Sequence, residues 1–75
     1  MTEFQKMVAE ACYDTLKNHY PNLIIVTEQL VAAGESSEAI HAHVSKGCGE
    51  FLASTIACAA DHIREMSNGQ AVPLD

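Results

Sequence analysis

The chain has 75 residues, of which 48% are hydrophobic, and its formal net charge of −6 comes from ten acidic and four basic residues. This length allows one domain, and the hydrophobic content is too high for a disordered chain. Four basic residues cannot form the clustered patch that displaces counterions from DNA or RNA or binds an anionic membrane, so we expect neither partner.

The cysteines and the N-terminal segment indicate the compartment. Cys12, Cys48 and Cys58 are an odd number and do not indicate a disulfide framework. The first ten residues, MTEFQKMVAE, are acidic and amphipathic, unlike a secretory signal. No apolar stretch approaches the roughly 20 residues of a membrane span. We therefore expect a cytoplasmic protein.

The first predicted helix opens with TEFQ. Thr2 and Gln5 have the spacing of a capping box, in which each side chain satisfies a free backbone N–H. Pro21 disfavours helical geometry in the residue before it, so the helix is expected to end near residues 18–20. Five residues recur at helical spacing and form the expected core face: Phe4, Val8, Ala11, Cys12 and Leu16.

The segment PNLIIVTEQLVAAG is predicted to be a second helix. Pro21 suits the first helical position, and Gly34 suits the left-handed residue that ends a helix. The run 23–26 is β-prone, so a short strand is the alternative. We favour the helix because no partner strand is visible elsewhere, and because four residues continue a helical period: Leu23, Val26, Leu30 and Ala33. A helix this apolar calls for burial on two sides, one of which can be a second subunit.

A turn and a short helix are expected next, within GESSEAIHAHVSKG. Ser36 or Ser37 is the expected N-cap. Ile40 and Val44 lie one helical turn apart and are predicted to face the core, and Gly47 is predicted to end the helix.

The last predicted helix begins at Gly49 and is closed by Gly69, and residues 70–75 are expected to be a flexible tail. Its apolar stripe consists of Leu52, Ile56, Ala59, Ala60, Ile63 and Met66. The whole pattern predicts an all-α fold, a small three- to four-helix bundle formed by one domain at residues 1–69. Because a single core is thin at this length, we expect the bundle to be dimeric.

Small residues gather on one side of the last helix. Small side chains let two helix axes approach closely, within one chain or between two copies. Packing inside the monomer is the favoured interpretation, and a dimer seam is the alternative. The residues expected in the close packing or in the dimer are Ala53, Ala57 and Ala60, with Ile24 and Ile25 from the second helix.

Neither a metal site nor a catalytic set is predicted. His41 and His43 are two apart, so on a helix they point about 200° apart and cannot bind one ion. Cys58 and His62 have usable ligand spacing, but no recognisable metal motif supplies the remaining ligands. Cys48, between two glycines, is interpreted as a small filler in a tight turn rather than as a nucleophile. We expect no cofactor and no enzymatic activity, with a metal- or thiol-dependent protein as a lesser alternative.

The stretch EQLVAAGESSEAIHAHV has the spacing of apolar and turn residues that is typical of a helix-turn-helix. It resembles the first half of the tetra-helical helix-turn-helix of LuxR-type regulators, in which an apolar helix ends in a glycine, a serine follows and an Ala-Ile pair begins the next helix. The resemblance implies a helix-turn-helix-like turn around residues 30–45 and makes a degenerate DNA-binding regulator the alternative function. A recognition helix needs exposed Arg, Lys, Asn or Gln, however, and GEFLASTIACAADHI offers almost none before Arg64.

The sequence favours a small acidic module that binds another protein, because it combines apolar surface with negative charge and lacks a convincing catalytic set. An acidic surface can pair with a basic patch, and many basic patches belong to nucleic-acid-binding proteins. A compact acidic protein of this length looks like the accessory inhibitors of phages and mobile elements, including anti-CRISPR proteins, which act by occluding a partner surface. The carboxylates expected to contact the partner are Glu3, Glu10, Asp14, Glu35, Glu38 and Glu50.

Overall fold

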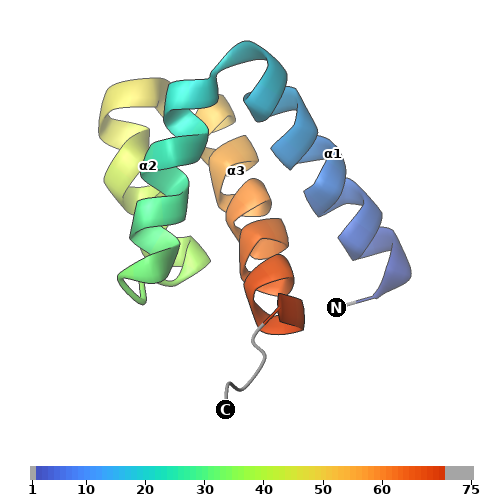
Figure 1. Ribbon diagram of the computed structural model, residues 1–75. Coiled ribbons are helices and arrows are strands. Elements are labelled where there is room, and N and C mark those ends of the chain that lie inside the picture. The colour runs from blue at the N-terminus through green and yellow to red at the C-terminus, as the bar shows by residue number, and fades with distance from the viewer. Residues whose placement is uncertain (1, 71–75) are drawn as a thin grey trace.

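The computed structural model describes residues 2–70, and their side chains as far as Ser67. Within this part of the chain there are three helices and no strand: α1 (Glu3–His19), α2 (Pro21–Ala32) and α3 (Ser37–Gln70). α1 and α2 run in opposite directions, and α3 folds back on itself at a bend, so successive segments alternate up and down (Figure 1). The prediction of an all-α fold is confirmed.

Helix α1 begins with the predicted capping box. The Thr2 hydroxyl accepts the Gln5 N–H at 3.1 Å, and the Gln5 side-chain oxygen accepts the Thr2 N–H at 2.9 Å. The helix ends at His19, and Tyr20 is both its C-cap and the N-cap of α2. One residue therefore connects the two helices, as the following proline led us to expect.

The core face of α1 agrees with the prediction at Leu16 and Cys12 and differs from it elsewhere. Ala9 and Leu16 are the buried residues of α1, with Cys12 and Tyr13 packed partly against the core, whereas Phe4 is 72% exposed. Val8 and Ala11 are exposed as well. Apolar residues occupy two faces of this helix, so periodicity alone could not choose between them. Small side chains at positions 9 and 12 let α1 lie closer to its neighbours than a face carrying phenylalanine and valine.

Segment 21–32 is helical throughout, which decides against a strand. Gly34 ends the helix with φ of 90°, as predicted, and a Schellman motif forms: the Glu35 N–H donates to the Leu30 carbonyl at 3.1 Å and the Gly34 N–H to the Val31 carbonyl at 3.0 Å. The predicted core face was only half right. Val26 is 43% exposed, and the buried residues are Ile24 and Thr27.

Helix α3 is two helical segments joined at Gly49, not at Gly47. The Ser36 hydroxyl caps its start by accepting the Ala39 N–H at 3.1 Å. Gly49 has φ of 84° and ψ of 163°, a conformation essentially restricted to glycine, and it separates segment 37–48 from segment 50–70. Gly47 remains helical, so its predicted role as the helix end was wrong. The predicted stop at residue 69 was also wrong, since α3 reaches Gln70, while positions 71–75 of the predicted tail lie outside the described residues.

The core is built around the second segment of α3. It unites side chains from all three helices: Leu16, Ile24, Ile40, Ile56, Ala59 and Ala60. Ala53, Ala60 and Ile24 are buried within the single chain, so in this fold they are not available to a second subunit. Ala57 is half-buried and Ile25 is 51% exposed.

Candidate functional site: an acidic groove between α1 and α3

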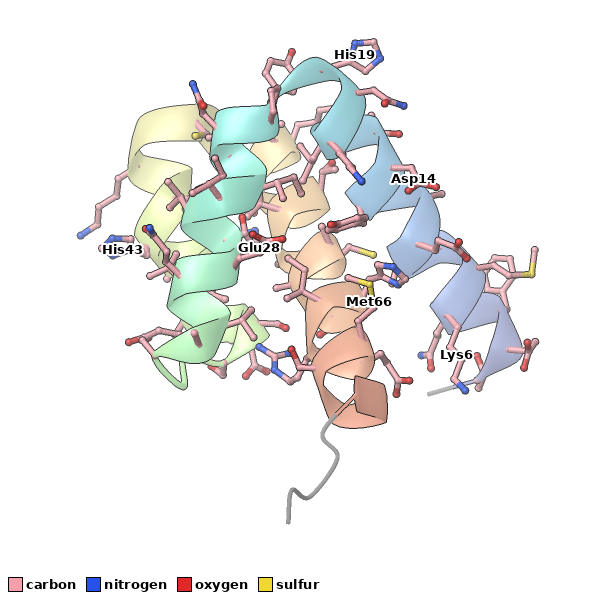
Figure 2. The ribbon with its side chains drawn as sticks, in the orientation of Figure 1. Lys6, Asp14, His19, Glu28, His43 and Met66 are labelled. Atoms are coloured by element: carbon pink, nitrogen blue, oxygen red, sulfur yellow. The ribbon has the colours of Figure 1, made fainter. Side chains whose placement is uncertain are left out.

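A groove of about 320 Å³ lies between the N-terminal half of α1 and the C-terminal end of α3. Figure 2 shows Met66 of α3 in the space between the two helices, and Lys6 near the start of α1. The groove is lined by Glu3, Lys6, Met7 and Glu10 from α1 and by His62, Glu65 and Met66 from α3. It therefore combines two methionines with three carboxylates. Methionine is flexible and polarisable, which suits it to contacts with apolar side chains of varied shape.

The charge of this groove is negative. Three glutamates face one lysine, and none of the three forms an ion pair with another described residue. The His62 ring packs on the Tyr13 ring with 5.0 Å between centroids, which holds the histidine against α1. Unpaired carboxylates beside apolar surface attract a cationic partner.

An exposed apolar stripe adjoins the groove on α1. It consists of Phe4, Met7, Val8 and Ala11, of which Phe4 is 72% and Met7 63% exposed. Helical spacing places Glu3, Glu10 and Asp14 along one edge of this apolar stripe. One helix thus presents apolar side chains and carboxylates next to each other, and Met7 belongs to both the stripe and the groove.

The six carboxylates expected to contact a partner do not form one surface. Glu3 and Glu10 line the groove, and Asp14 lies further along α1 (Figure 2). Glu35 and Glu38 lie at the connection between α2 and α3. Glu50 follows the Gly49 bend, where its carboxylate is 3.4 Å from Nε2 of His41.

Sequence reasoning missed the α3 side of this groove. Glu65 and Met66 join Glu3 and Met7 only because the second segment of α3 packs along α1. Met66 was assigned to the core stripe, and Glu65 was not singled out. No local signal could have found this set, because its two halves are more than fifty positions apart.

The cysteine and histidine candidates do not converge. His41 contacts Glu50 and Ser54, while His43 lies on the outer surface of the first segment of α3 (Figure 2). Among residues 2–70, no three His, Cys, Asp or Glu side chains are grouped closely enough to hold a metal ion.

Burial, the neighbouring Cys12 thiol and Asp61 raise the pKa of Cys58 to about 11, so this thiol stays protonated at neutral pH. A protonated thiol is a poor nucleophile.

Arg64, the single arginine of the chain, is engaged within the fold. Its Nη1 donates to the Ser37 hydroxyl at 2.9 Å and to Asp61 Oδ1 at 3.1 Å, and its Nη2 donates to the Glu35 carbonyl at 3.0 Å. Ser37 also donates to Asp61. The network joins the end of α3 to the turn after α2, which leaves the guanidinium little freedom to bind a phosphate.

No helix within residues 2–70 combines the length and apolar character needed to cross a bilayer. Comparison of the chain with known protein families, with curated proteins and with solved structures finds no match.

Proposed function

We propose that this protein is a small acidic binding module that recognises another protein and covers the surface it binds. The observation that carries the proposal is the combination, on one exposed side of α1, of the apolar stripe with the acidic groove. Apolar contact supplies binding energy and carboxylates speed the encounter with a basic partner. Neither contribution requires a cofactor or a reaction.

The partner segment has a definable chemistry. It carries a large apolar side chain that contacts Met7 and Met66, with Lys or Arg placed to meet Glu3, Glu10 and Glu65. Basic, partly apolar surfaces of this kind are common where proteins bind DNA or RNA. Occlusion of such a surface makes the protein an inhibitor or accessory factor, of the type that phages and mobile elements encode, including anti-CRISPR proteins.

A helix-turn-helix regulator is the alternative function, and it has less support. The turn at residues 33–36 joins α2 to α3, as such a motif requires. The segment that follows the Gly49 bend offers one arginine for DNA contacts, and Arg64 already binds Ser37, Asp61 and the Glu35 carbonyl. A metal- or thiol-dependent activity finds no grouped ligands among the described residues.

The test compares two double variants that change charge by the same amount. Glu3→Gln with Glu10→Gln alters the groove, and Glu35→Gln with Glu38→Gln alters the connection between α2 and α3. The wild-type protein is used to capture and identify its partner from host extract, and purified partner is then titrated with each variant. An exposed charge pair contributes about 0.2–1 kcal/mol, so we expect the groove variant to bind roughly 2- to 30-fold more weakly and the control to match wild type.

The same titration is repeated at increasing salt and with duplex DNA in place of the protein partner. Binding to the partner is expected to weaken as salt screens the carboxylates. Tight binding of DNA with a steep salt slope supports the regulator instead. Equal loss in both double variants shows that the groove is not the binding site.

A further inference from the structure

The outer face of α2 is exposed and carries no charge. It consists of Asn22, Ile25, Val26, Gln29, Ala32 and Ala33, all of them exposed to solvent. Helical spacing places these residues on the side of α2 opposite Ile24 and Thr27, the two that are buried. Ile25 is 51% and Val26 43% exposed, so the face has an apolar centre.

One carboxylate, that of Glu28, borders this face. Glu28 is the single charged residue of α2, and it lines a groove with Arg64 between α2 and α3. Figure 2 shows Glu28 on the side of α2 that is turned toward α3. Glu28 is itself exposed and lies about one helical turn from Ile25 and Ala32, so it borders the six uncharged residues on one side.

We propose that the uncharged face of α2 binds a second copy of this protein. Two copies of an acidic chain repel each other, so they associate most readily where they present the fewest carboxylates, and this face borders one, Glu28. The apolar stripe of α1 meets this condition less well, because a two-fold contact there brings together two rows of three carboxylates, Glu3, Glu10 and Asp14. This inference concerns a different helix from the proposed function and does not depend on it.

An antiparallel pairing of α2 with its copy fits the sizes of the side chains. When the two-fold axis passes beside Gln29, Ile25 of one copy lies opposite Ala33 of the other, and Val26 lies opposite Ala32. Large residues then face small ones on both sides of Gln29, which lets the two helices approach evenly. The two Gln29 amides meet at the axis, where each can donate to the other.

The size of the face sets the expected affinity. Six residues on each copy cover less than the roughly 800 Å² per partner of a standard interface, so the dimer is expected to be weak. We expect a monomer of 8.1 kDa in dilute solution and a mass that rises with concentration. Added salt is expected to strengthen this association, since it screens the net repulsion and leaves an uncharged contact unaffected. The proposed partner binding has the opposite salt dependence.

Sedimentation equilibrium from about 10 µM to about 1 mM tests the proposal, because this range brackets weak dimers. Ile25→Glu is expected to abolish the rise in mass, and Phe4→Glu, an equal change on the apolar stripe of α1, is expected to leave it intact. Circular dichroism checks that each variant is folded. Gln29→Glu is the second variant: it retains a good helix former but places two carboxylates at the axis, so dimerisation is expected to fail at pH 7 and return near pH 4. A wild-type mass of 8.1 kDa at the highest concentration overturns the proposal, as does loss of the dimer in Phe4→Glu but not in Ile25→Glu.

Discussion

The outer faces of α1 and α2 are both apolar and exposed, but they differ in charge. The apolar stripe of α1 has three carboxylates along one edge, whereas the face of α2 borders one, Glu28. In so small a bundle a helix cannot bury its whole circumference, so apolar side chains remain outside the core. In our two proposals the neighbouring charges distinguish the partners: the acidic edge of α1 meets a basic protein, and the less charged face of α2 meets a second copy.

The largest expected effect is on the free energy of unfolding, where a change in the core costs much more than a change on either outer face. Ile56 is buried at the centre of the core, and Ile56→Ala is expected to lower the free energy of unfolding by about 2–5 kcal/mol. Phe4→Ala and Ile25→Ala are expected to change it by less than about 0.5 kcal/mol, because both side chains face solvent in the monomer. Urea denaturation at low protein concentration measures all three. A cost for Phe4→Ala as large as that for Ile56→Ala contradicts the division into core and outer face.

The next effect concerns the bend that brings α3 back along α1. Gly49→Ala forces a side-chain-bearing residue into a glycine conformation and is expected to cost about 1–3 kcal/mol. Gly47→Ala is the matched control two positions away. It replaces a helical glycine in open space, so a gain of about 0.5–1 kcal/mol is expected. Thermal unfolding of the two variants must give opposite signs if Gly49, rather than Gly47, makes the bend.

A smaller effect is expected at the start of α1, which carries the groove glutamate Glu3. Thr2→Ala removes the hydroxyl that accepts the Gln5 N–H and is expected to destabilise the protein by about 1 kcal/mol. Thr2→Ser retains the acceptor and is expected to behave as wild type. If partner binding depends on an ordered first turn, Thr2→Ala also weakens binding, whereas self-association through α2 is unaffected.

The smallest expected effect is on the pH dependence of stability, and it concerns the Cys58 thiol of α3 beside Cys12 of α1. The pKa of Cys58 is raised from 9.0 to about 11, so the thiol holds its proton more tightly in the folded state. Its contribution to stability is complete below pH 9 and is lost as pH rises through about 11, because the unfolded thiol ionises first. Cys58→Ala is expected to reduce the fall in the free energy of unfolding between pH 9 and about 11, relative to wild type. An unchanged decline shows that other groups cause it.

Local sequence signals predicted the helices better than the surfaces. The capping box at Thr2, the helix start at Pro21 and the left-handed Gly34 all act within a few residues, so the sequence was sufficient to place them. The start of the last helix at Gly49 was also right, but the predicted helix end at Gly47 was wrong, because both glycines are equally permissive. Only the packing of the two α3 segments against the rest of the bundle decided which one leaves the helix.

By itself, the sequence determined an acidic, all-α chain with three correctly placed helix starts, because caps, prolines and periodicity act over short distances. Only the tertiary structure decided which of two apolar faces of α1 entered the core. That choice exposed Phe4 and Val8 and brought Glu65 and Met66 beside Glu3 and Met7. The physical reason is that burial is shared among helices distant in sequence, so the surface left over is a property of the whole bundle.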